Sequence, residues 1–168
     1  IIIIVIAVKN GWTLTLIDIK TFFLYGELPK TEVIYMEPMP GVVPPGEEKL
    51  YVLRLLKAIY GLPQASHYAQ CKLRNCLKEG RFQQSQFDAC LYILDEEEAK
   101  YYITTHVDDQ LSTGTAAGEK RAIDTLEKVF EIKITKDPTL ILGVQLERNR
   151  AEKTAKLHQT TYIKTAID

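Results

Sequence analysis

Cysteines are scarce in this sequence, and the few that are present exclude a disulfide scaffold. Three cysteines, Cys71, Cys76 and Cys90, form no Cys-x-x-Cys pair, and only three histidines could complete a zinc site with them. An odd number of cysteines in such a pattern is typical of free thiols in a reducing compartment. We therefore expect an intracellular protein, cytoplasmic or nuclear, that is not secreted.

Long apolar runs are also lacking. The opening run, residues 1–8, is short, whereas a membrane-spanning helix needs about 20 apolar residues. An initiating methionine, a basic leader and a small-residue cleavage site are missing from this end, so a signal peptide is not expected. We expect no membrane partner and a biological N-terminus upstream of Ile1.

Neither sign of charge is in excess. The 21 Lys and Arg residues against 22 Asp and Glu residues give a formal net charge of -1. A protein that coats nucleic acid indiscriminately needs a clear cationic surplus, so that class is excluded. The bases are nevertheless concentrated between residues 49 and 81, where Glu79 is the only acid. A local basic surface is therefore compatible with an almost neutral protein.

Internal repeats and low-complexity linkers are absent too, and the composition of 46% hydrophobic and 26% charged residues is typical of soluble globular proteins. We expect one domain over residues 1–168. Strands are predicted at residues 14–19, 90–94, 101–107, 111–113, 140–146 and 156–159. Helices are predicted at residues 65–79, from near Gly118, and at the end of the chain, and a Pro- and Gly-rich loop at residues 37–48. This order predicts an α+β fold whose antiparallel sheet is covered on one face.

Three aspartates are the strongest candidates for chemistry. Asp18 closes a short apolar run, and Asp108 with Asp109 follows about ninety residues later at the tip of a predicted hairpin. An Asp-Asp pair in a turn is, taken alone, more often structural. Two divalent cations about 3.5 to 4 Å apart need several carboxylates from different elements. If these acids converge, their mutual repulsion implies a bound divalent ion.

Six ordered blocks of sequence resemble those of copia-type retrotransposon reverse transcriptases. They are LIDIKTFFLYGEL (16–28), VIYMEP (33–38), LLKAIYGLPQA (55–65), SQFDACLY (85–92), HVDD (106–109) and ILGVQLE (141–147), the last followed by LHQ (157–159) and YI (162–163). Each block alone is a weak signal. Because they occur in the family's order and span nearly the whole chain, the resemblance is specific. Residues 1–8 occupy the place of a helix that precedes the first block, although four successive isoleucines favour a strand.

The resemblance implies an RNA-directed DNA polymerase with a palm-like antiparallel sheet and two packing helices, a split βαβ or ferredoxin-like arrangement. It implies two Mg²⁺ ions, which Mn²⁺ could replace, and nucleotidyl transfer to a primer 3′-hydroxyl. Asp18 and Asp108 would bind both metals, the backbone carbonyl of Ile19 would help, and Asp109 would support the site. The partners would be an RNA or DNA template with its primer, deoxynucleoside triphosphates, and the remaining polyprotein segments.

The same resemblance assigns roles to other residues, each with a plainer alternative. Phe23 aligns with the aromatic gate that excludes a ribose 2′-hydroxyl, but it is equally well a core residue. Gln64 matches a residue near the incoming nucleotide, although any turn before a helix needs turn-forming residues of this kind. Gly143 falls in a segment that approaches the primer, or it marks a bulge.

The basic residues of the predicted helix at 65–79 form a further candidate surface. Lys72, Arg74 and Lys78 could follow template phosphates, although a solvated charged face explains such residues more often. His106 would lie near the primer end.

Two positions depart from the family's pattern. His106 replaces the usual Tyr, which shortens the reach of the ring and adds sensitivity to pH, and Gln110 stands where an aliphatic residue usually follows the acids. We expect the hairpin to pack less tightly as a result. The fingers segment that clamps the triphosphate would lie upstream of Ile1, and the thumb would lie beyond Asp168, so we expect a domain truncated at both ends.

Two other functions therefore stay open. The chain could be a catalytically silent relic, retained as a nucleic-acid-binding or interaction domain. A two-metal nuclease would need a water-activating base near the acids, and the sequence singles out none.

Overall fold

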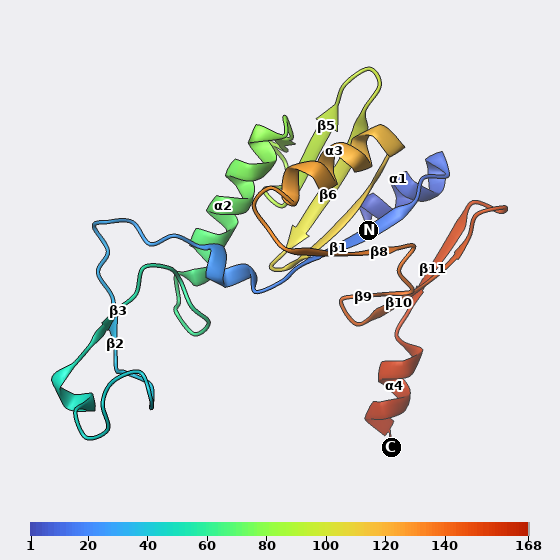
Figure 1. Cartoon of the computed structure of the whole chain (residues 1–168). Helices are drawn as coiled ribbons and strands as arrows, with labels where there is room; N and C mark the ends of the chain where they lie inside the picture. The colour runs from blue at the N-terminus through green and yellow to red at the C-terminus, as the bar shows by residue number, and fades with distance from the viewer. Residues whose placement is uncertain (168) are drawn as a thin grey trace. The chain divides into compact units, whose positions relative to one another are not determined.

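Strand β1 (Leu14–Ile19) lies where the sequence predicts a strand, and it is an inner strand of a six-stranded antiparallel sheet (Figure 1). The computed structural model describes residues 1–167. The sheet has the order β4-β5-β6-β7-β1-β8. Its other strands are β4 (Gln83–Gln84), β5 (Leu91–Asp95), β6 (Lys100–His106), β7 (Asp109–Gly114) and β8 (Ile132–Lys136).

Contacts between residues divide the chain into two compact units. One consists of Ile1–Lys20 and Asn75–Asp168, and the other of Thr21–Arg74. Helix α2 (Ala65–Glu79) begins in the second unit and ends in the first. It occupies the range that its apolar spacing predicts. None of the helices in residues 1–167 is long and apolar enough to cross a membrane.

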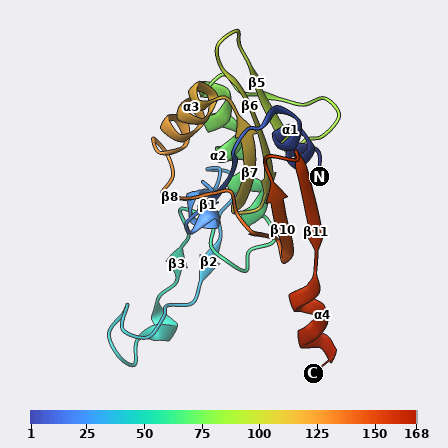
Figure 2. The same cartoon turned by 90° about the vertical axis from the view of Figure 1, so that its right-hand side faces the viewer.

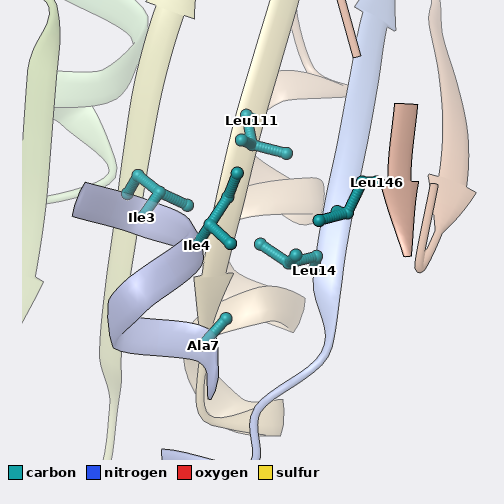
Figure 3. Close-up of a cluster of buried hydrophobic side chains, with 6 residues drawn as sticks. All are labelled: Ile3, Ile4, Ala7, Leu14, Leu111 and Leu146. Atoms are coloured by element: carbon teal, nitrogen blue, oxygen red, sulfur yellow. The ribbon is translucent and has the colours of Figure 1, made fainter. Parts of the chain in front are cut away.

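Helix α1 (Ile2–Asn10) forms despite the strand propensity of its isoleucines. Its residues Ile3, Ile4 and Ala7 are buried in one cluster with side chains of three strands, as Figure 3 shows. The cluster is completed by Leu14, Leu111 and Leu146. Gly11, in the left-handed conformation with φ of 68°, ends the helix. Burial of the apolar side chains in the tertiary structure therefore outweighs the strand propensity of the isoleucines.

Helix α3 (Ala116–Leu126) packs on the other face of the sheet. Thr15, which points away from its neighbour Leu14, donates a hydrogen bond to Glu119 of this helix at 2.7 Å. Figure 2 shows α1 and α3 on opposite sides of β6 and β7. The α+β class is confirmed. The expectation that one face alone is covered is wrong, because α1 supplies a second covering layer.

A second sheet, of three strands, has the order β11-β10-β9. It consists of β9 (Leu140–Ile141), β10 (Val144–Asn149) and β11 (Thr154–His158), and helix α4 (Thr160–Ile167) follows. The single strand predicted over residues 140–146 is wrong. Leu142 and Gly143 have φ of 48° and 78°, so they form the two-residue turn of a tight hairpin between β9 and β10.

Arg148 of β10 and Arg150, which follows the end of that strand, bind the end of α1, the residues after it and the loop after β8. Arg148, whose side chain is 9% exposed, bonds to the carboxylate of Asp137 and, at 2.8 Å, to the backbone carbonyl of Ala7. Arg150 bonds to the other oxygen of Asp137 and to the Thr13 hydroxyl. These bonds hold the end of β10 against α1 and the loop after β8.

The second unit contains little regular structure. It has two short 3-10 helices, η1 (Phe22–Tyr25) and η2 (Glu48–Leu50), and a two-stranded sheet of β2 (Tyr35–Met36) and β3 (Leu53–Arg54). The predicted Pro- and Gly-rich loop joins β2 to η2. Gly26 packs against α2 so closely that a Cβ there would lie 3.0 Å from the backbone nitrogen of Ala69.

Candidate active site

The register of the sheet places the candidate aspartates together. Asp18 of β1 is paired with Asp109 of β7, and Asp109 is paired with His106 of β6. Directly opposed residues share one face, with Cβ atoms about 4.5–5.5 Å apart. Asp18, Asp109 and His106 therefore form a row across three strands, on the same face as α1.

Asp108 lies next to this row, in a strained turn. Val107 and Asp108 form the two-residue loop between β6 and β7, and Val107 has φ of 54°. A single positive φ at the first loop position is the pattern of a type II′ turn, which usually has glycine there. A β-branched residue in this conformation is strained, and such strain is common at functional sites. The backbone N–H of Ile19 donates to the Asp108 carbonyl at 2.9 Å, which fixes the turn beside the end of β1.

The carboxylates influence one another electrostatically. Burial raises the pKa of Asp109, and the charges of Asp108 and Asp18 raise it further, while His106 opposes the shift. Within residues 1–167, however, no three His, Cys, Asp or Glu side chains are gathered closely enough to hold a metal ion. The backbone therefore brings the three acids together, and their side chains are not arranged as a ligand set.

Lys133 is a site residue that the sequence reasoning missed. It is exposed on β8 and paired with Asp18, on the side of β1 away from Asp109. Strand β8 was not predicted, although the alternation of Ile132 and Ile134 with polar residues is a signal from which it could have been. A cation thus stands beside the row of acids.

Gln110, which we expect to loosen the packing of the hairpin, is a buried polar residue beside the turn, and the looser packing stays a prediction. Its side chain is buried, with 0% exposure, and its amide donates to the Val107 carbonyl at 3.2 Å. This bond ties the side chain to the turn. The Gln110 Oε1 atom finds no hydrogen-bond partner among the described residues, so the substitution adds a buried acceptor that is not satisfied.

A cavity of about 480 Å³ adjoins the row of acids in the first unit. Its lining includes His106 and Asp109 on one side and Leu142, from the β9–β10 turn, on another. Gly143 follows Leu142 in that turn, with φ of 78° and open space where a Cβ would be. Gly143 is therefore a turn residue and not a bulge, and its hairpin lines the same cavity as the candidate site.

Two predicted nucleotide-binding residues lie in the second unit. Phe23, in η1, is half-buried and packs edge to face on Tyr60 with ring centroids 4.9 Å apart. Its neighbour Phe22 is the one that is fully buried. Gln64 directly precedes α2 and donates its side-chain amide to the carboxylate of Glu32.

The three basic residues of α2 do not form one uniform surface. Lys72 is paired with Glu27 at 2.6 Å, so its charge is already compensated. The Nε atom of Arg74 is buried without a hydrogen-bond partner among residues 1–167, and Lys78 is exposed. Arg74 and Lys78, four residues apart in α2, share a helix face that Lys72 does not.

Comparison with known proteins identifies the family. Residues 1–168 match the family described as reverse transcriptase (RNA-dependent DNA polymerase). The chain belongs to the reverse transcriptase family. The resemblance to copia-type retrotransposon enzymes is confirmed by its relatives. No solved structure matches this reverse transcriptase chain.

Among those relatives are two polyproteins of Arabidopsis thaliana. The chain is 35% identical over 144 residues to the retrovirus-related Pol polyprotein from transposon RE2, and 32% identical over 144 residues to that from transposon RE1. It is 31% identical over 154 residues to the retrovirus-related Pol polyprotein from transposon TNT 1-94 of Nicotiana tabacum. These matches cover 85%, 85% and 90% of the chain. The reverse transcriptase chain spans only 10% to 11% of the length of these polyproteins.

Proposed function

We propose that this chain carries the catalytic carboxylates of an RNA-directed DNA polymerase within a retrotransposon polyprotein. The observation that carries the proposal is the pairing of Asp18 with Asp109 across β1 and β7, with Asp108 at the adjoining turn. In this proposal the six-stranded sheet with its helices is a palm-like split βαβ arrangement. The reaction is nucleotidyl transfer from a deoxynucleoside triphosphate to a primer 3′-hydroxyl.

The donor set suits hard divalent cations. Carboxylate and carbonyl oxygens are the ligands that Mg²⁺ and Mn²⁺ prefer. The pKa of Asp109 is raised first by burial and then by the negative charges of Asp108 and Asp18, which a cation would offset. Asp18 and Asp108, with the carbonyl of Ile19, would hold two ions, and Asp109 would support them. Bound cations would lower the pKa of the primer hydroxyl and neutralise charge on the triphosphate.

The remaining residues would position the substrates. Phe23 and Gln64 would contact the incoming nucleotide, and His106 and Gly143 the primer. Arg74 and Lys78 would contact phosphates of the template. Lys72 would do so only by giving up its ion pair with Glu27. A chain with a formal net charge of -1 binds its template through such local contacts.

The decisive experiment measures template-directed incorporation by a longer polyprotein segment that contains this chain, in Mg²⁺ or Mn²⁺, together with the thermal stabilisation that each ion produces in the chain. We expect the wild-type segment to extend a primer and the wild-type chain to gain stability with ion concentration, by about 2.7 kcal/mol at a hundred times the dissociation constant. Asp18→Asn and Asp108→Asn each remove a ligand that acts on developing charge, so incorporation should fall at least about 100-fold. Both variants should also lose the stabilisation.

The matched control is Asp124→Asn, because Asp124 is an exposed aspartate on α3. It should leave both measurements unchanged. If Asp108→Asn leaves ion binding as it is in the wild type, and the wild type incorporates no nucleotide in either metal, the polymerase proposal is wrong.

A silent nucleic-acid-binding or interaction domain is the second candidate. The observation in its favour is that no metal-binding cluster of side chains is formed within residues 1–167. Retention of a primed template without incorporation, in either metal, would identify it.

A further inference from the structure

The carboxylate of Glu32 holds two side chains at the start of α2. Its Oε1 accepts a hydrogen bond from the side-chain amide of Gln64, and its Oε2 accepts one from the hydroxyl of Tyr68. All three residues belong to the second unit, Thr21–Arg74, and all three are half-buried. Both oxygens of one carboxylate are thus engaged, one by the residue before α2 and the other by a residue in the first turn of α2.

The backbone around Glu32 is fixed by contacts of its own. The Gly26 carbonyl accepts a hydrogen bond from the Ala58 N–H at 2.8 Å, and the Glu32 N–H donates to the Pro29 carbonyl at 2.9 Å. Glu27, at the other end of this segment, is paired with Lys72 at 2.6 Å. Because residues 64, 68 and 72 are spaced four apart, they lie on one face of the helix. Glu27 and Glu32 therefore bind side chains along one side of α2.

This contact determines which atom Gln64 presents outward. An ionised carboxylate only accepts hydrogen bonds, so the amide nitrogen of Gln64, and not its oxygen, must face Glu32. The Oε1 atom of Gln64 is then directed away from Glu32 as an acceptor. The Tyr68 hydroxyl fixes the second carboxylate oxygen, and this bond to Glu32 is the main reason why the pKa of Tyr68 is raised.

We infer that Glu32 is a positioning residue for the incoming nucleotide, because it fixes the orientation in which Gln64 offers its carbonyl oxygen. The inference rests on the proposed polymerase function and on the role of Gln64 in it. Glu32 itself does not touch the nucleotide. Its effect is to hold Gln64 in the binding orientation before the nucleotide arrives, which lowers the cost of ordering that side chain.

The test is a double-mutant cycle in primer extension by the polyprotein segment that contains this chain. Glu32→Gln keeps the size of the side chain but can both donate and accept, so Gln64 is free to turn over. We expect Glu32→Gln to raise the KM for the deoxynucleotide about tenfold, as loss of one hydrogen bond does, with kcat within about twofold. Gln64→Ala should raise the KM at least as much. In the double variant, Glu32→Gln should add nothing to Gln64→Ala, because it acts only through that residue.

Two controls separate positioning from a general structural effect. Glu37→Gln changes an exposed glutamate of the same unit and should leave KM and thermal stability unchanged. The absorbance of tyrosinate, followed against pH, should contain a late-titrating component that Glu32→Gln moves to lower pH and Tyr68→Phe removes. If Glu32→Gln does not move that component, the contact does not exist in solution and the inference is overturned.

The kinetic outcomes distinguish this inference from the proposed function. If the wild type incorporates nucleotide but Glu32→Gln raises the KM of Gln64→Ala by the same factor as that of the wild type, the polymerase stands and the positioning role is wrong. If the wild type incorporates nothing in either metal, the polymerase proposal fails, and the positioning role fails with it.

Discussion

Gln110 is a polar residue in a fully buried position of β7. Its amide bonds to the Val107 carbonyl, while its Oε1 atom has no partner in the described part of the chain. An unsatisfied buried acceptor costs about 1–3 kcal/mol, whereas a typical hydrogen bond contributes about 0.5–1.5 kcal/mol. The balance therefore favours an apolar residue of similar size at this position.

We expect Gln110→Leu to raise the free energy of unfolding by about 1 kcal/mol, because it removes the unsatisfied acceptor and adds apolar burial. In a chain of this length the melting temperature should rise by roughly 2–4 °C. Thermal and urea unfolding measure both quantities. Gln110→Glu is the contrasting variant, since it buries a charge and should lower stability at neutral pH. A loss of stability in Gln110→Leu would mean that Oε1 is satisfied in solution.

The sequence was informative about some site residues and silent about others. Asp18, Asp108 and Asp109 could be named because they stand in motifs, and the register then placed two of them opposite each other. Lys133 and Glu32 could not be named from motifs. Lys133 stands out only through its cross-strand pairing with Asp18. Glu32 stands out only through its hydrogen bonds to Gln64 and Tyr68, which are 32 and 36 positions away in the sequence. No local sequence pattern encodes either contact.

At the scale of helices and strands, Glu119 connects α3 to the six-stranded sheet by hydrogen bonds. It accepts hydrogen bonds from Thr15 of β1 at 2.7 Å and from Lys136 of β8 at 2.9 Å. Burial acts to raise the pKa of Glu119, but the bonds from Thr15 and Lys136, with the charge of Lys136, outweigh it and leave the pKa below its usual value. The folded state therefore binds this proton less readily than the unfolded chain does.

Because the pKa of Glu119 is lower in the folded state, the stabilisation by this contact depends on pH. The stabilisation by Glu119 is present above its ordinary pKa of 4.5 and is lost as the pH falls through the lower folded value. We expect Glu119→Gln to lower the free energy of unfolding by about 1 kcal/mol at pH 7, mainly through the lost ion pair with Lys136. Urea unfolding from pH 7 down to pH 3 should show the difference from wild type shrinking in the acidic range. A difference that stays constant with pH would contradict the ionic origin of the contact.

The elements that the sequence predicted correctly are those whose pattern and surroundings agree. Strand β1 and helix α2 were expected over the residues they occupy. There the periodic spacing of the apolar residues and the residues that end each element indicate the same bounds. Helix α1 and the β9–β10 hairpin were not resolved in this way. In α1, burial against Leu14 and Leu111 overrides strand propensity, and in the hairpin Leu142 adopts a positive φ that is rare for leucine.

At the scale of the whole molecule, burial is unevenly distributed within the first unit. Strands β1, β6 and β7 contain residues with no exposed surface, among them Ile17, Ile103 and Ser112. The four residues from Thr154 to Leu157 in β11 are exposed, and α4 has no buried residue among those described. Local opening is easiest where few apolar contacts must be broken.

We therefore expect backbone amide hydrogens to exchange slowly in β1, β6 and β7 and rapidly in β11 and α4. Amides that open only on global unfolding should exchange at least about 1,000-fold more slowly than those that open locally, given typical domain stabilities. Hydrogen–deuterium exchange read by mass spectrometry at peptide resolution measures this difference. Helix α1 is the internal control, because it lies at one end of the chain yet buries Ile3, Ile4 and Ala7. If burial governs opening, α1 should exchange slowly like the central strands; rapid exchange in α1 would mean that position in the chain governs it instead.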